Sequence, residues 1–209
     1  MLHSAEIRWF AEGDPDAAVI DEFRRSALAA DEEPRIDSYL LLPGCTSAGV
    51  KVRQGHLEVK ALTSTPEPVC YDNGLSGTRA SWLKWSSGIA GAPLLEERKG
   101  PETWVQVQKA RMLRLFDLGS GGPLEVSPAE WLDGTGCYVE LARLCVTADT
   151  DVWSTTAKWW SVCFEAFGGE SLTALDAVAS LGAFRLLGDL LTADASMGYP
   201  EWLSRNSLS

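Results

Sequence analysis

The amino-acid sequence predicts an α+β protein built on a closed or nearly closed antiparallel β-barrel (a tunnel) of about eight strands, with helices packed outside it. Three observations support this prediction. Strand-like segments follow one another along most of the chain, basic side chains recur at alternate positions within them, and a late segment has apolar residues at helical spacing. With 209 residues, the chain is expected to form one domain, 1–209.

The N-terminal part begins with a strand and a helix. Residues 6–10 have the pattern of a strand. Asp14 can cap a helix with Pro15 at its first position, and this helix is expected to run toward Ala30. After a turn that contains proline, a second strand is expected at residues 36–42.

The middle of the chain is typical of strands separated by turns. Residues 49–54 and 57–62 flank a short turn and are expected to form a hairpin. Residues 63–78 are rich in Thr, Pro, Gly and Asn and indicate a loop. Strand patterns return at residues 79–85 and over the long segment 104–118.

The last third is expected to add two strands and a helix. Strand patterns cover residues 137–147 and 159–167. A helix over about residues 171–191 follows, because its leucines, together with Val178 and Phe184, recur at helical spacing. We expect the apolar face of this helix to pack on the outside of the barrel or to cap one end.

The composition restricts the possible partners. A net charge of −11 repels nucleic acid and anionic membranes, so we expect no nucleic acid and no membrane partner. No apolar stretch approaches the roughly 18–20 residues of a membrane span, and five scattered cysteines argue against a disulfide framework. These features favour a cytoplasmic protein, and they do not determine its oligomeric state.

Basic residues lie on one face of five predicted strands. Side chains two apart in a strand share a face, so Lys109 pairs with Arg111. Seven of the 18 Lys and Arg residues occupy such faces: Arg8, Lys51, Arg53, Lys60, Lys84, Lys109 and Arg111. One interpretation is a solvated face, the usual arrangement in an antiparallel sheet. The other is a barrel that turns these residues inward, where they would bind a small-molecule polyphosphate or another anionic ligand.

Acidic residues lie on the same kind of segment as the basic ones. They are Glu6, Glu58, Glu140 and Glu165. Like charges placed so close in a lumen are costly unless carboxylates or an anion neutralise them. A mixture of acidic and basic groups therefore suggests a metal-bound polyphosphate, and Glu58 is expected instead to hold a neighbouring basic side chain.

Short strand motifs recur in a defined order between Glu6 and Glu165. They are Ser4-Ala5-Glu6-Ile7-Arg8, Lys51-Val52-Arg53, Glu58-Val59-Lys60, Lys109-Ala110-Arg111, Val139-Glu140-Leu141 and Phe164-Glu165. Over nearly the whole chain, this ordered set resembles the CYTH superfamily of triphosphate tunnel enzymes, whose first strand has the pattern Glu-x-Glu-x-Lys. Two positions depart from the family: Ser4 and Ala142 stand where it has carboxylates.

The resemblance implies a single CYTH-like domain that holds a triphosphate in a basic tunnel. The seven basic residues would bind the phosphates, and Glu6, Glu140 and Glu165 would hold Mg²⁺ or Mn²⁺. The implied reaction is hydrolysis of an inorganic, nucleoside or thiamine triphosphate, without an assigned catalytic residue. Because Ser4 and Ala142 reduce the number of metal ligands, the alternative is a noncatalytic tunnel protein that binds a phosphorylated or polyanionic ligand.

Other chemistry-bearing motifs are not supported. His3 and His56 are the two histidines, and neither lies near a Cys or Asp pattern, so we expect no zinc site and no Ser-His-Asp triad. Residues 119–122 are glycine-rich but lack the Lys-Ser/Thr ending of a P-loop. Arg114 and Arg143 have the opposite parity from the basic face of their strands and are expected outside the lumen.

Overall fold

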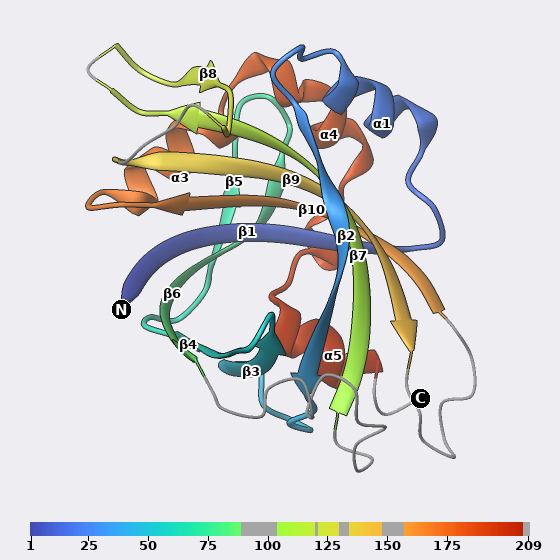
Figure 1. Cartoon of the computed structure of the whole chain (residues 1–209). Coiled ribbons are helices and arrows are strands. Elements are labelled where there is room, and N and C mark those ends of the chain that lie inside the picture. Colours follow the sequence, from blue (N-terminus) through green and yellow to red (C-terminus); the bar gives the residue numbers. More distant parts are fainter. Residues whose placement is uncertain (89–103, 120, 130–133, 148–156, 207–209) are drawn as a thin grey trace.

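The computed structural model describes residues 1–88, 104–119, 121–129, 134–147 and 157–206 (Figure 1). The strands are β1 Leu2–Glu12, β2 Ala30–Leu40, β3 Ala48–Arg53, β4 His56–Leu62, β5 Glu67–Cys70, β6 Ser76–Gly88, β7 Trp104–Asp117, β8 Leu124–Val126, β9 Gly136–Thr147 and β10 Ala157–Phe167. The α-helices are α1 Ala17–Arg24, α3 Ser171–Ala179, α4 Arg185–Leu190 and α5 Tyr199–Asn206, and 3-10 turns cover Gly182–Phe184 and Ala193–Ala195.

Eight strands close into an antiparallel barrel in the order β1, β10, β9, β7, β2, β3, β4 and β6. The ring closes because β1 pairs with β10 on one side and with β6 on the other, so that Glu6 lies between Glu165 and Ala80. The short strand β5 extends the sheet beside β6, and β8 pairs with β7. The predicted α+β fold, an antiparallel barrel with helices outside, is confirmed.

The larger hydrophobic core lies between the outside of the barrel and its helices. The outward positions of β1, β9 and β10 contribute Ile7, Val139 and Phe164, and α1 and α3 contribute Phe23 and Leu175. All five side chains are fully buried. Because the apolar faces of these strands are covered from outside, their charged faces point into the barrel rather than toward bulk solvent.

A second hydrophobic core fills one end of the barrel interior. Phe10, Val107 and Leu144 lie on inward faces of β1, β7 and β9, and α5 packs against them near the lower end of the view in Figure 1. The ring of Trp202 in α5 stacks on Phe10 with 4.5 Å between ring centroids. Helix α5 and this core leave the remainder of the interior to charged side chains.

The prediction of one continuous helix over residues 171–191 is wrong. The chain forms α3 and α4, which are bent by 63° relative to each other. The backbone of Leu181 is extended, and the side-chain amide of Asn73 donates hydrogen bonds to the carbonyl oxygens of Ala179 and Leu181 at 2.7 and 2.9 Å. These bonds satisfy carbonyls that a continuing helix would have used, so α3 ends there. No single described helix is long and apolar enough to cross a membrane. This bent pair reaches the required length and hydropathy only when its two halves are counted together.

Three predicted boundaries also differ from the structure. The expected loop over residues 63–78 contains β5 and the start of β6, which pair with each other. Helix α1 ends at Arg24, and Ala30 already belongs to β2, opposite Leu113 of β7. The expected turn around Pro34 lies within β2 at a register shift, a position where a strand tolerates proline.

Candidate functional site

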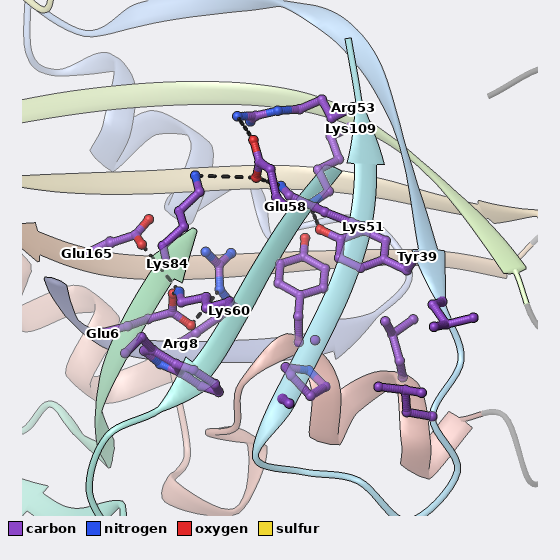
Figure 2. A pocket seen from close by; sticks show the side chains of 18 of the residues that line it. Glu6, Arg8, Tyr39, Lys51, Arg53, Glu58, Lys60, Lys84, Lys109 and Glu165 are labelled. Carbon is purple, nitrogen blue, oxygen red and sulfur yellow. Dashed lines mark hydrogen bonds and ion pairs between the residues drawn. The ribbon is translucent and has the colours of Figure 1, made fainter. Parts of the chain in front are cut away.

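The inward faces of the strands enclose a cavity next to α5 (Figure 2). About 980 Å³ of space free of protein atoms lies in and in front of the cavity, open solvent included. Every candidate site residue from the sequence lines this cavity: Arg8, Lys51, Arg53, Lys60, Lys84, Lys109, Arg111, Glu6, Glu140 and Glu165. The structure therefore brings all of them together, while their roles in binding and metal coordination remain predictions.

Strand parity explains which side chains enter the cavity. Lys109 and Arg111 share the inward face of β7, whereas the next residue, Met112, belongs to the outer core. Arg114 lies on the outward face, where its Nε and Nη2 donate hydrogen bonds to the Glu125 carboxylate at 2.9 and 2.7 Å. Arg143 is exposed on β9. Both arginines therefore lie outside the lumen, as predicted.

Positive charges outnumber negative charges two to one in the cavity wall. Eight basic side chains and four glutamates line the cavity, Arg35 being the eighth basic residue and Glu58 the fourth glutamate. The carboxylate of Asp37, fully buried against the cluster, adds a fifth negative charge. Because the whole chain has a net charge of −11, the cavity is a local positive region within an acidic protein.

Asp37 organises one half of the basic cluster. Its carboxylate lies 3.0 Å from Lys109 Nζ, 3.2 Å from Lys51 Nζ and 3.3 Å from Arg35 Nε. Burial opposes ionisation of Asp37, but Lys109, Lys51 and Arg35 outweigh it and hold its pKa well below the usual range. Burial also lowers the pKa of Lys109 and that of Lys51 to about 8, because Asp37 compensates only part of the lost hydration.

Two stacked tyrosines hold Lys109 in place. Its ammonium group donates a hydrogen bond to the Tyr39 hydroxyl at 2.6 Å and lies 3.9 Å from the centroid of the Tyr199 ring. The two tyrosine rings stack with 5.2 Å between their centroids. Tyr39 comes from β2 and Tyr199 from the start of α5, so Lys109 lies at the junction between the charged cluster and the helix.

Lys60 joins two of the predicted metal ligands. Its Nζ lies 2.5 Å from Glu6 Oε2 and 3.3 Å from Glu165 Oε1, and these two glutamates face each other across β1 and β10. Burial opposes the charge of Lys60, but Glu165 and Glu6 outweigh it and raise its pKa. Ser4, which replaces a carboxylate of the CYTH pattern, donates from Oγ to Glu165 Oε1 at 3.3 Å.

Glu140 lies between two arginines and apart from the other predicted metal ligands. Its Oε1 accepts a hydrogen bond from Arg8 Nη1 and its Oε2 accepts one from Arg111 Nη1, both at 2.9 Å. Burial disfavours its charge, but Arg8 and Arg111 outweigh burial and lower its pKa. Ala142, the second departure from the CYTH pattern, is fully buried in the apolar core at the end of the barrel.

Glu58 holds three basic side chains on the opposite wall, as expected from the sequence. Its carboxylate lies 2.6 Å from Arg53 Nη2, 3.2 Å from Lys51 Nζ and 3.3 Å from Lys84 Nζ (Figure 2). Burial opposes its charge, but Lys51, Lys84 and Arg53 together lower its pKa. Arg53 and Lys84 each keep partial access to solvent, so both can move toward a ligand without unfolding the wall.

The three carboxylates predicted to hold a metal ion line the cavity, and two of them are cross-strand neighbours. Within the described residues, no group of three His, Cys, Asp or Glu side chains is placed to hold a metal ion. Glu6 and Glu165 are register partners, and Mg²⁺ commonly uses one or two carboxylates together with water and substrate phosphates. Basic side chains contact all three carboxylates: Lys60 and Arg8 contact Glu6, Lys60 contacts Glu165, and Arg8 and Arg111 contact Glu140.

Sequence reasoning missed several residues of the site. They are Arg35, Asp37, Tyr39, Trp82 and Tyr199. Asp37 and Tyr39 lie two apart in the strand predicted for residues 36–42, and Trp82 precedes Lys84 by two residues. The alternation rule would have found these three if it had been applied to all polar and aromatic residues. Tyr199 gave no such signal because it enters the cavity from α5.

Comparisons with known proteins identify no family. No family model matches the chain, and no curated protein matches it. Similar solved structures include that of the PH1012 protein from Pyrococcus horikoshii OT3, with a TM-score of 0.41 and 13% sequence identity over 94% of this chain and 98% of that chain. Similarity at this level supports no conclusion about family or function. The description of the molecule therefore rests on its own features, a closed antiparallel barrel with a net positive cavity.

Proposed function

We propose that this chain is a CYTH-like tunnel protein that binds a phosphorylated polyanion, such as tripolyphosphate, inside its barrel. The main support is the convergence of eight basic side chains on one cavity of a protein with net charge −11. Lys and Arg donate charge-assisted hydrogen bonds to phosphate oxygens, and several phosphates in series can use several strands at once. Binding is the function that the geometry supports best.

Internal ion pairs keep the cluster ordered without a ligand. Glu58 holds Arg53 and Lys84, and Glu140 holds Arg8 and Arg111. An incoming anion exchanges some of these carboxylate contacts for phosphate contacts and neutralises the excess of positive charge. We therefore expect the ligand to raise the melting temperature, and the rise to shrink with added salt because the attraction is electrostatic.

Calorimetric titration with tripolyphosphate in the presence of EDTA tests the binding function. Arg111→Ala should weaken binding about tenfold to a hundredfold, because a charge-assisted hydrogen bond contributes about 1.5–3 kcal/mol. Lys158→Ala is the matched control, since this cation is 69% exposed and lies near Asp14 rather than in the cavity. Absence of binding at low salt, or an equal loss of affinity in the two variants, would contradict a site in the lumen.

Hydrolysis of a bound triphosphate is a second candidate function, favoured by the Glu6 and Glu165 pair. When a phosphate draws Lys60 away from them, two adjacent carboxylates and the phosphate oxygens provide a hard oxygen site suited to Mg²⁺ or Mn²⁺. Such an ion, when bound, neutralises charge on the phosphoryl group and lowers the pKa of a coordinated water. In this arrangement Lys60 binds the phosphate, and Glu6 and Glu165 hold the ion.

Release of phosphate from inorganic, nucleoside and thiamine triphosphates, measured with Mg²⁺ and with Mn²⁺, tests the second candidate. Glu165→Gln should abolish release, whereas its affinity for tripolyphosphate in EDTA should stay equal or increase, because one negative charge has left the lumen. Glu67→Gln, an exposed partner of Arg79 on β5, is the control and should retain release. No release by the parent protein would leave binding alone, and normal release by Glu165→Gln would exclude this glutamate from the reaction.

A further inference from the structure

The cavity has an apolar wall beside the charged cluster. This wall consists of Leu40, Leu42, Ala48, Gly49, Pro200 and Leu203. Its parts come from the end of β2 and the residues just beyond it, the start of β3, and α5. The backbone N–H of Gly44 donates to Ser204 Oγ at 3.0 Å, and a Cβ placed on Gly49 would lie 3.1 Å from Pro200 Cγ. Gly49 and Pro200 are therefore in contact, and all six residues line the same cavity.

Aromatic side chains mark the boundary between the apolar wall and the charged cluster. Lys60 Nζ lies over the Trp82 ring, 5.0 Å from its centroid, and Gly198 is so near that a Cβ there would be 2.9 Å from Trp82 Cζ2. Trp82 is only 2% exposed. Its Nε1 and the buried Tyr199 hydroxyl have no hydrogen-bond partner among the described residues. Neither atom is accessible from the cavity, so these two side chains contribute their rings to the boundary, with Lys60 Nζ over the ring of Trp82 and Lys109 Nζ over that of Tyr199.

From this arrangement we propose that the ligand is an organic phosphate or diphosphate with an aliphatic group. The phosphate lies on the basic cluster, and the aliphatic group lies on the apolar wall, with the rings of Trp82 and Tyr199 between the two parts. This inference rests on the proposed anion-binding function and narrows it to one chemical class. The basic cluster and the apolar wall line the same cavity, so one ligand can contact both.

Inorganic polyphosphate and nucleotides fit this cavity less well. Inorganic tripolyphosphate would leave the apolar wall exposed to water. A nucleobase would lose hydrogen bonds to water against Leu40, Leu42, Leu203 and their neighbours, because none of the six wall residues has a polar side-chain atom. An aliphatic group loses no hydrogen bond and gains from burial.

Titration with methyl, butyl and hexyl diphosphate in EDTA tests the inference. Affinity should increase with chain length, by up to about fourfold per buried methylene, so that hexyl diphosphate binds at least about tenfold more tightly than methyl diphosphate. Uridine diphosphate should bind no more tightly than methyl diphosphate. Equal affinities across the alkyl series, or a clear preference for the nucleotide, would overturn the aliphatic ligand and leave anion binding intact. Failure of every diphosphate and of tripolyphosphate to bind would instead overturn the proposed function.

Leu42→Ser locates the aliphatic group. Leu42 is half-buried two residues beyond the end of β2, so the variant is expected to fold, which a melting curve verifies. Affinity for hexyl diphosphate should fall about threefold to tenfold, and affinity for methyl diphosphate should not change. Leu124→Ser is the matched control, because Leu124 is 65% exposed on β8 and does not line the cavity. Equal losses for the two diphosphates in Leu42→Ser would show that the chain does not contact this wall.

Discussion

The two ends of the barrel interior are built from the same strands and have opposite chemical character. On β7, Val105 and Val107 belong to the apolar core around α5, whereas Lys109 and Arg111 on the same face belong to the charged cavity. Strand β1 repeats this change with Phe10 and Arg8. One inward face therefore passes from apolar to charged along a single strand.

This difference indicates that the apolar end stabilises the fold, whereas the charged end is the candidate site for anion binding. At the apolar end, Trp202 is 2% exposed and packs edge-on against Trp159 at 5.6 Å, so it removes a large apolar area from water. At the charged end, buried ion pairs offset their own desolvation only in part, and cations are in excess. Substitutions at the apolar end should therefore lower stability, and those at the charged end should mainly change anion binding.

Trp202→Ala should produce the largest effect. Loss of this side chain leaves a cavity at the apolar end and should lower the free energy of unfolding by about 3–5 kcal/mol, measured by urea denaturation. Molecules that remain folded should bind tripolyphosphate with an affinity within about threefold of the parent, because Trp202 does not line the charged cavity. Trp85→Ala is the matched control, since Trp85 is 45% exposed and should contribute less than about 1 kcal/mol. Equal losses of stability would contradict the assigned role of the apolar end.

Asp37→Asn tests the charged end and should have an intermediate effect. Lys109 and Lys51 lose a charged partner, so the ligand-free protein should be less stable by about 1.5–3 kcal/mol. Tripolyphosphate should then raise the melting temperature more than it does in the parent, because phosphate oxygens replace the missing carboxylate. Asp176→Asn removes a partner of Arg79 outside the barrel. It should lower stability, but tripolyphosphate should raise its melting temperature no more than it does in the parent. If the ligand raises the melting temperature of Asp37→Asn no more than that of the parent, the anion does not reach Lys109 and Lys51.

Much of the candidate site could be predicted from the sequence because strand parity is a local property. Arg53 and Lys60, for example, needed only their strand assignments to be placed on the correct face. No single strand could distinguish a lumen from a solvated face, since both present the same alternation. Only closure of the ring, through the pairing of β1 with β6, turns that face inward.

The pairing of charges could not be predicted because it depends on register between strands. Glu6, Glu140 and Glu165 were grouped as one metal site, yet Glu6 lies opposite Glu165, whereas Glu140 lies opposite Cys163 and Leu113. Register is determined by the whole set of neighbouring strands and turns, which one segment does not reveal. For the same reason, Asp37 was not recognised as the partner of cations that come from two other strands.

The smallest effect is expected in the pH dependence of anion affinity, and it depends on the lysines that Asp37 holds. Burial lowers the pKa of Lys109 and that of Lys51 to about 8, so both lose charge in mildly alkaline solution. Cyclic trimetaphosphate is a suitable probe because its own charge is constant in this range. Its affinity, measured by calorimetry, should fall on the order of tenfold between about pH 7.5 and about pH 9.

Titration of the same two lysines should change the stability of the ligand-free protein in the opposite direction. Unfolded lysines titrate near about pH 10.4, so between about pH 8 and that value the unfolded chain binds more protons than the folded one, and this contribution to stability rises with pH. Lys109→Gln should flatten both the affinity curve and the stability curve, because one of the two titrating groups is gone. Lys158→Gln, 69% exposed on β10, should leave both curves unchanged. Affinity for trimetaphosphate that stays constant or increases through pH 8 would show that Lys109 and Lys51 do not contact the anion, and would confine its site to the part of the cavity near Lys60 and Arg8.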